Sequence, residues 1–370
     1  MNSQPRAATL GAATLEMENA SANRPMASVI ICNFNYAPFL GAAIDSALAL
    51  NWSPLEVIVV DDGSTDSSRE VMEFYCNRIR TLCKENGGQR TAYAAGFALS
   101  QGEFIIFLDS DDLLDPEILN ETATIWTPEV SKVQVQMRVI DGAGNPTGAV
   151  FPPFFHVPAP AEIRRWMFTS SAYPTPPGSG NVFSRKFLSR IFPIEDNFDY
   201  AGDSYTLAAA PALGDVKTIA RPLAFYRVHG RNDGAMSAID ASRFAAEVKR
   251  AYGRYAYACN IAQKAGLEPR PDAVRFSLST IPYRLASFVL SPATHPVKGD
   301  GRFKIVADAL QAAFIPQGTT TASRFSLSIW TILVALLPRR MAEVMIRWRF
   351  VAASRPKVLL GLMRRLRLTR

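Results

Sequence analysis

The feature that most limits how this chain can fold is an apolar strand that ends in a cluster of carboxylates. Residues 104–108 read Phe-Ile-Ile-Phe-Leu, and Asp109, Asp111 and Asp112 follow at once. Carboxylates held close together repel one another unless a cation lies between them. Because no Cys or His stands nearby in the sequence, the oxygen ligands favour a hard divalent ion, Mg2+ or Mn2+, which usually bridges carboxylates to a substrate phosphate. The alternative is an acidic turn in which Asp112 caps the next helix.

A second apolar run ends in the same way. Residues 56–60 are followed by Asp61, Asp62, Gly63 and Ser64, and the glycine allows a tight turn after the strand. Ligands of open parallel sheets bind beyond the carboxyl ends of the strands. We therefore expect both acidic clusters to line one crevice.

Strand and helix patterns alternate through the first third of the chain. Apolar β-branched runs predict strands, and a period of 3.6 residues predicts helices. The predicted strands are 29–32, 56–61, 79–83, 104–108 and 132–140, and the predicted helices are 39–50, 67–77, 89–100 and 116–126. This order indicates an α/β fold with a mostly parallel sheet flanked by helices. Prolines between 152 and 177 indicate irregular loops, and beyond about residue 240 apolar residues at intervals of four predict a helical C-terminal region.

Four segments resemble, in order and spacing, the motifs of the family 2 glycosyltransferases, inverting enzymes with the GT-A nucleotide-diphospho-sugar transferase fold. They are residues 28–36, 60–66, 86–89 and 107–112, and the resemblance extends over residues 28–235. It implies transfer of a sugar from a nucleotide diphosphate donor, with a UDP-sugar expected, to a hydroxyl of a glycan or lipid-linked acceptor. The resemblance further implies a divalent metal cofactor, Mg2+ or Mn2+. The basic C-terminal tail, described below, suggests an acceptor held at a membrane and a role in cell-surface polysaccharide synthesis.

The resemblance also assigns residues to the donor and to the metal. The residues expected to contact the donor nucleotide are Cys32, Asn33, Phe34, Asn35, Asp61, Asp62, Gly88, Gln89 and Asp109. The metal would be held by Asp109, Asp111 and His229, the last within a Tyr-Arg-Val-His segment similar to the family's late motif. An aspartate can accept the N–H of a uracil ring, and a neutral imidazole can ligate a metal. Cys32 stands where many family members have proline.

The family places its general base, usually the aspartate of a Glu-Asp pair, at the start of a helix that faces the acceptor. Asp203 is the better match because a helical run begins directly after it, although Gly202 replaces the glutamate. Glu195-Asp196 is the competing pair, and a plain helix cap is the alternative role for Asp203. The segment that resembles the acceptor side of the family's site consists of Ser179, Gly180 and Asn181.

Two other functions compete with sugar transfer. A nucleotidyltransferase would also bind a metal through carboxylates on a similar sheet, but it ordinarily has a Gly-rich, Lys- or Arg-bearing phosphate loop, which residues 33–36 lack. A catalytically inactive nucleotide-sugar-binding scaffold is the other candidate. The carboxylates at positions 109, 111 and 203 argue against a scaffold, because binding alone does not need a general base.

Composition, helical periodicity and the family resemblance together divide the chain into four expected segments. A chain of 370 residues is long enough for two cores. We expect a disordered arm over 1–27, a GT-A domain over 28–235, a helical extension over 236–320 and a basic amphipathic tail over 321–370. Four scattered cysteines without metal-binding spacing fit a reduced, cytoplasmic chain.

The tail carries the positive charge of the chain. Residues 321–370 hold ten arginines and Lys357 against the single acid Glu343, a net charge of +10, whereas the whole chain carries +7. The apolar run 327–337 is too short to span a bilayer, and Trp348 lies between two arginines, as in segments that rest in the lipid headgroup layer. We expect peripheral attachment to the inner face of the cell membrane. The alternative is a core helix followed by a solvated basic helix, and no nucleic-acid partner is expected, because no recognition fold accompanies the charge.

Overall fold

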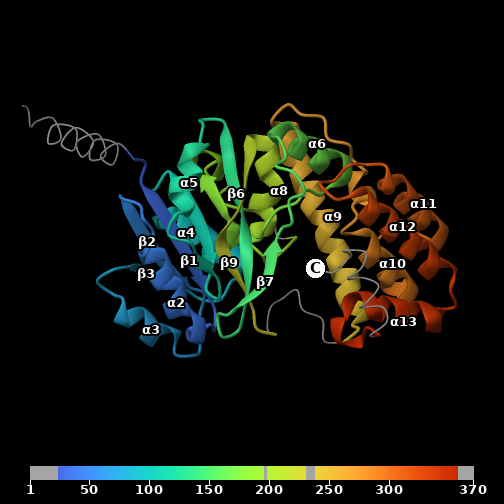
Figure 1. Ribbon diagram of the computed structural model, residues 1–370, viewed down its shortest axis with the longest axis horizontal. Helices are drawn as coiled ribbons and strands as arrows, with labels where there is room; N and C mark the ends of the chain where they lie inside the picture. Colours follow the sequence, from blue (N-terminus) through green and yellow to red (C-terminus); the bar gives the residue numbers. More distant parts are fainter. Residues whose placement is uncertain (1–23, 196–197, 231–237, 357–370) are drawn as a thin grey trace, which may run out of the picture.

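The computed structural model describes residues 24–195, 198–230 and 238–356. Most of the arm expected over 1–27, the Asp196 candidate and the end of the tail, 357–370, lie outside these ranges. The described chain forms a sheet with helices on both faces. A helical region follows in the sequence and lies beside the sheet, at the end of the molecule away from β3 (Figure 1).

Four parallel strands form the first half of the sheet, in the order β3-β2-β1-β4. Their bounds are β1 Ala27–Asn33, β2 Leu55–Asp61, β3 Arg80–Cys83 and β4 Phe104–Asp109. All four lie within a residue or two of the predicted strands. In register, Asn33 lies beside Asp61 and Cys32 lies beside Asp109. The two acidic strand ends are therefore separated only by the end of β1, as the parallel arrangement predicts.

The second half of the sheet is mixed rather than parallel. It contains β5 Leu113–Leu114, β6 Val130–Asp141, β7 Pro146–Phe151, β8 Asn181–Ser184 and β9 Asp215–Val228. β8 runs antiparallel to β4 and β6, whereas β9 runs parallel to β6 and antiparallel to β5. Of these five strands, the sequence analysis predicted only β6. The long β9 matters most, because it carries the Tyr-Arg-Val-His segment back to the end of β4.

Helices cover both faces of the sheet because successive strand residues point to opposite sides. Val29 and Ile31 of β1 pack on one side, whereas Ile30 packs on the other. The first face is covered by α2 Ala37–Leu48, α3 Ser68–Phe74 and α5 Ile118–Thr124, and the second by α4 Gln89–Leu99, α6 Pro160–Ser170, α7 Arg185–Leu188 and α8 Asp203–Leu213. Both cores are rich in Ile, Val, Leu and aromatic side chains, and their burial stabilises the sheet.

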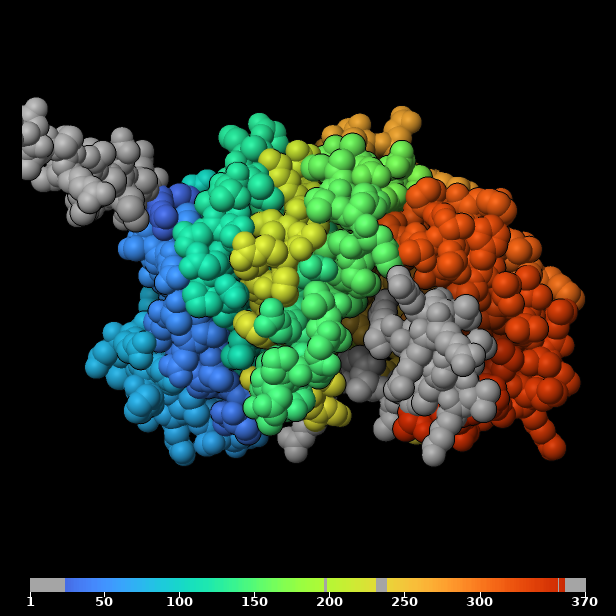
Figure 2. Space-filling model, in the orientation of Figure 1, coloured from blue at the N-terminus to red at the C-terminus, as the bar shows by residue number. Residues whose placement is uncertain are grey.

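The helical region begins with α9, which packs against α8 and so joins this region to the sheet. Its helices are α9 Ala241–Lys264, α10 Ile281–Leu290, α11 Arg302–Ala313, α12 Thr321–Leu336 and α13 Arg339–Phe350. Short 3-10 turns occupy Gly178–Gly180, Ala273–Phe276, Pro292–Thr294 and Ala352–Ser354. Figure 2 shows the red C-terminal residues gathered at one end of the molecule, away from the blue N-terminal residues.

α12 and α13 contribute to the core of the helical region. Val334 and Ala335 of α12 are buried in this core, as are Ala342 and Ile346 of α13. α12 packs on α10 and α11, and α13 packs on α10 and α12. The apolar run 327–337 is thus a core helix on its inner side, which is the alternative considered above. No helix within the described ranges is long and apolar enough to cross a membrane.

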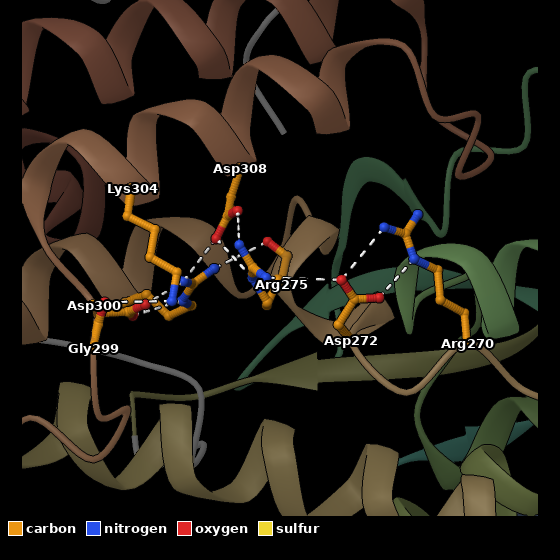
Figure 3. A network of polar contacts seen from close by, with 8 residues as sticks. Arg270, Asp272, Arg275, Gly299, Asp300, Lys304 and Asp308 are labelled. Carbon is orange, nitrogen blue, oxygen red and sulfur yellow. Dashed lines mark hydrogen bonds and ion pairs between the residues drawn. The ribbon is translucent and has the colours of Figure 1, made fainter.

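Buried ion pairs hold the loops of the helical region together (Figure 3). Arg284 of α10 is fully buried and donates to Asp300 at 2.7 Å and to Asp308 at 2.9 Å. Arg275 reaches Asp308 at 2.6 Å. A charge buried in this way is costly unless its partners are complete, so the network constrains how α10 and α11 pack.

Candidate active site

The turn after β2 is held by side chains from the end of β1. Asn33 Nδ2 donates to Asp61 Oδ1 and to Ser64 Oγ, each at 3.1 Å, and the Asp61 side chain is fully buried. Asn35 adopts a left-handed conformation with φ 58°, and its Oδ1 accepts from Thr65 N at 2.8 Å. Asn33, Asn35 and Asp61 therefore shape the turn on which the predicted nucleoside contacts lie.

Asp62 is paired with Lys84, a residue to which the sequence analysis gave no role. Its Oδ1 accepts from Lys84 Nζ at 2.5 Å and from Gly87 N at 3.1 Å. Gly63 adopts φ +82°, and a Cβ there would approach Asn86 N to 2.8 Å, so the turn requires glycine. Phe34 next to this turn is 44 % exposed.

Gln89 links the donor side of the site to the start of α8. Its Nε2 donates to Asp109 Oδ1 at 2.6 Å, and its Oε1 accepts from Gly202 N at 2.9 Å. Gly88, with φ +81°, directly precedes α4 and sets the direction in which Gln89 leaves the turn. The predicted donor residue Asp109 and the predicted base Asp203 are thus positioned by one amide side chain.

The acidic cluster after β4 is contacted by Arg227 of β9 and by His229, which directly follows β9. Asp111 Oδ2 lies 3.0 Å from His229 Nε2, and Arg227 Nε donates to the Asp111 carbonyl at 2.8 Å. Asp112 Oδ1 accepts from Arg227 N at 3.0 Å, so Asp112 ties the turn to β9 and does not cap the following helix. The capping alternative is wrong, because the following helix begins at Ile118 with Glu117 at its N-cap and no side-chain cap hydrogen bond.

Burial and mutual repulsion raise the pKa values of the cluster. Burial, with Asp112 and Asp111 nearby, holds the pKa of Asp109 well above its usual range. Burial and Asp111 raise the pKa of Asp112 to about 8. Asp112 Oδ2 is buried, and within the described ranges it makes no hydrogen bond. These are the properties of carboxylates placed where positive charge is needed.

The donor set fits a divalent ion that a substrate helps to hold. Among the residues that the structure describes, no three His, Cys, Asp or Glu side chains converge as a complete metal site. Asp111 and His229 nevertheless stand 3.0 Å apart. This is about the separation of neighbouring ligands that lie about 2.1 Å from an octahedral ion, and Mg2+ is usually bound by one or two protein ligands, waters and substrate phosphates. The His229 ring is held by stacking on Phe39, with 4.9 Å between ring centres.

Asp203 is the first residue of α8 and lies close enough to the acidic cluster to influence it. Burial raises the pKa of Asp203, whereas Arg254 and Arg250 of α9 oppose this rise. A Cβ at Gly202 would approach the Tyr93 ring to 2.7 Å. This close packing explains why glycine stands where the family usually has glutamate.

The loop before Asp203 is anchored by Asp199, which the sequence analysis did not single out. The Asp199 side chain is fully buried, accepts from Ser204 Oγ at 2.5 Å and pairs with Arg250 at 2.9 Å. Arg254 donates to Ser204 Oγ at 3.1 Å. An open cavity lies beside this loop and is lined by Gly87, Arg90, Phe198, Asp199, Tyr200 and Arg250.

Ser179, Gly180 and Asn181 are fully buried and support the site from behind. Ser179 Oγ accepts from Asp109 N at 3.1 Å. Asn181 Oδ1 accepts from Lys132 Nζ at 2.7 Å, and its Nδ2 donates to the Pro177 carbonyl at 2.7 Å. The side chains of Ser179 and Asn181 contact residues of the sheet and the adjoining loop. A role on the acceptor side would therefore be indirect, through the backbone segments that these contacts position. Lys132, whose pKa burial holds well below its usual range, was missed because strand position alone does not reveal it.

Comparisons with known proteins agree with this geometry. The family model for glycosyl transferase family 2 matches residues 28–192. An uncharacterized glycosyltransferase of Nostoc sp. is 36% identical over 223 residues, which are 58% of this chain and 68% of that protein. The hyaluronan synthase of Pasteurella multocida is 39% identical over 107 residues, 28% of this chain but only 11% of that enzyme.

The fold is shared with a solved transferase. The structure of S. aureus TarS 1–349 in complex with UDP-GlcNAc superposes with a TM-score of 0.53 at 15% identity. The match covers 84% of this chain and 90% of TarS 1–349. The predicted GT-A fold, a sheet flanked by helices with a helical C-terminal region, is confirmed.

Proposed function

The chain belongs to glycosyl transferase family 2, and from this premise we propose an inverting, metal-dependent transfer of a sugar from a nucleotide diphosphate, a UDP-sugar, to an acceptor hydroxyl. The observation that carries the proposal is the bridge made by Gln89. It contacts both Asp109 and Gly202, so the donor carboxylates and the candidate base Asp203 share one site. A glycosyltransferase needs these two functions within reach of one sugar.

The chemistry follows from the residues that surround this bridge. Asp203 accepts the proton of the acceptor hydroxyl, whose oxygen forms a bond to the anomeric carbon as the bond from that carbon to the diphosphate oxygen breaks. Burial raises the pKa of Asp203 and so makes it a stronger base, whereas Arg254 opposes this rise. A divalent ion held by Asp111, His229 and the diphosphate would supply the positive charge that stabilises the leaving group. Direct attack inverts the anomeric centre and needs no covalent glycosyl-enzyme.

The acceptor proposed is a glycan or a lipid-linked glycan in the synthesis of a cell-surface polysaccharide, with the enzyme peripheral on the inner face of the cell membrane. The names of two similar proteins of Pasteurella multocida, hyaluronan synthase and chondroitin synthase, support a polysaccharide product. The basic character of residues 321–370 supports a membrane-held acceptor.

Release of free nucleotide diphosphate from a panel of UDP- and GDP-sugars, with Mn2+ or with a chelator, tests the proposal. We expect release only with metal and loss of at least 100-fold in turnover for Asp111→Asn. Asp115→Asn is the matched control, because Asp115 lies four residues further along and contacts Glu117 N rather than His229. Full turnover of Asp111→Asn would contradict the metal assignment. Donor binding without release or transfer would favour the inactive scaffold.

A further inference from the structure

The outward side of α12 is apolar along its whole length. Phe325, Ile329, Leu333 and Leu336 are exposed at 41 %, 57 %, 47 % and 67 %, and their spacing of four, four and three residues places them on one stripe. The opposite side of the same helix, which includes Val334, is buried in the core of the helical region. A surface helix normally presents polar residues to water, so a helix that is apolar on both sides indicates a surface that is covered in use.

α11 extends this stripe into a face. Phe303, Leu310 and Phe314 are exposed at 82 %, 45 % and 73 %. The two helices run antiparallel, because Arg302 at the start of α11 donates to the Leu337 carbonyl beyond the end of α12 at 2.8 Å, while Phe314 and Phe325 meet at the other end with ring centres 5.6 Å apart. Both helices pack on α10, so their free sides point away from it together.

These seven residues, Phe303, Leu310, Phe314, Phe325, Ile329, Leu333 and Leu336, make up what we term the α11–α12 face. α11 and α12 lie at the end of the molecule opposite β3 and α3 (Figure 1). Seven large apolar side chains on two adjacent helices exceed the single scattered hydrophobic residues that are normal for a surface.

Basic residues outnumber acidic residues in the sequence segment that carries the face. Between residues 302 and 340 the basic residues are Arg302, Lys304, Arg324, Arg339 and Arg340, and the only acid is Asp308. Asp308 is buried and paired with Arg275 and Arg284, so it contributes no exposed negative charge. Two copies of the chain that met through this face would bring like charges together. An anionic lipid surface would meet both the apolar residues and their basic rim with complementary chemistry.

We propose that the α11–α12 face docks on an anionic lipid bilayer, with α11 and α12 lying in the plane of the headgroups. This inference deepens the membrane-held acceptor of the proposed function by naming the surface that binds. It differs from attachment through the basic tail alone, because α11 precedes that tail and α12 stays packed in the core. Vesicle binding needs neither donor nor acceptor, so it succeeds or fails independently of sugar transfer.

Sedimentation of the full chain with phosphatidylglycerol and phosphatidylcholine vesicles tests the apolar part. The triple variant Phe303→Gln, Ile329→Gln, Leu333→Gln changes exposed positions only and uses a good helix former, so its melting temperature should match that of the wild type. We expect at least a tenfold loss of vesicle binding. The control is Phe74→Gln on α3, because Phe74 is also 82 % exposed but lies outside the face.

The charged rim is tested by Lys304→Gln with Arg340→Gln, which should weaken binding to anionic vesicles about thirtyfold. Lys249→Gln on α9 should leave binding unchanged, and vesicles of phosphatidylcholine alone should bind little of either protein. The chain ending at residue 356 should still sediment, since it retains the face. Wild-type sedimentation by the triple variant would overturn the proposal. So would loss of binding through deletion of 357–370 alone, or a wild-type dimer that becomes monomeric in the triple variant.

Nucleotide release in vesicle-free solution should be the same in the wild type and the triple variant. A variant that releases nucleotide normally but does not sediment supports the docking face. A wild type that sediments but releases no nucleotide from any donor would instead sink the proposed function and leave the docking face standing.

Discussion

Single side chains decide whether the two halves of this site face each other. The side-chain nitrogen of Gln89 donates a hydrogen bond to Asp109, and its side-chain oxygen accepts one from the backbone N–H of Gly202. An amide suits this place because it offers a donor and an acceptor at once. Asp109 and Asp203 are both partly buried, so water would replace a lost contact of either carboxylate only in part.

Gln89→Leu should therefore damage both functions that the bridge serves. We expect turnover to fall roughly 10- to 100-fold, since a displaced general base loses its alignment with the acceptor. Nucleotide affinity should weaken as well, because Asp109 loses its hydrogen bond. Steady-state kinetics and nucleotide binding by calorimetry would measure the two effects. The neighbouring change Arg90→Gln, which removes a contact to the Ile194 carbonyl, should leave Asp109 in place.

Asp203→Asn separates catalysis from donor binding. Asparagine keeps the shape of the side chain but cannot take up the acceptor proton, so turnover should drop by about 10²- to 10⁴-fold. The dissociation constant of the nucleotide diphosphate should stay within about twofold of the wild type. If the variant turned over acceptor at the wild-type rate, Asp203 would be only a helix cap.

Among the elements, α9 connects the helical region to catalysis. Arg250 and Arg254 lie one turn apart on α9. Arg250 contacts Asp199 in the loop before α8, and Arg254 contacts Ser204 in the first turn of α8, next to the base. Asp199 forms ion pairs with both arginines, and its side chain is fully buried. A helix outside the sheet thereby fixes the electrostatics of a residue at the sheet edge.

Arg254→Met should move the pH dependence of turnover. Asp203 must be ionised to accept a proton, so activity is lost as pH falls through its pKa. Burial raises the pKa of Asp203 and Arg254 lowers it, so loss of the arginine should raise that pKa and shift the acidic limb of kcat/KM to higher pH. Lys264→Gln, at the exposed end of the same helix, serves as the control. A shift to lower pH or no shift would contradict the role given to Arg254.

At the scale of the whole molecule, the helical region has a core of its own, and its loops depend on buried charge. Arg284 has no exposed side-chain surface, and its partners Asp300 and Asp308 are almost as deeply buried. His295 Nε2 also reaches Asp300, at 3.1 Å. Removing one member leaves buried charge without a counter-ion.

Arg284→Leu should lower the free energy of unfolding by about 3–5 kcal/mol. The partly exposed pair of Arg270 and Asp272 gives the comparison, since Asp272→Asn should cost about 1 kcal/mol or less. Urea unfolding followed by circular dichroism measures both. Equal losses in the two variants would mean that the buried network adds no more than a surface pair.

Deletion of residues 321–370 should also destabilise the protein, for a different reason. The deletion removes α12, which packs on α10 and α11, and α13, which packs on α10, so apolar core surface would be left in water. We expect aggregation or a much lower melting temperature. A chain that ends at residue 356 keeps both helices, so its melting temperature should equal that of the full protein. Point substitutions on the α11–α12 face are for this reason a cleaner test of membrane binding than removal of the tail.

The α/β fold class, the four parallel strands and the carboxylates that follow β2 and β4 could be predicted, because they depend on local apolar patterns and on residues adjacent in the chain. Which residues far apart in the chain meet is visible only in the folded structure. His229 lies 118 residues from Asp111, and Gln89 lies 113 residues from Gly202. The missed strand β9, the cation beside Asp62 and the outward side of α12 were decided in the same way. Such contacts depend on how all the strands and helices pack together, and the local periodicity of the sequence does not reveal that packing.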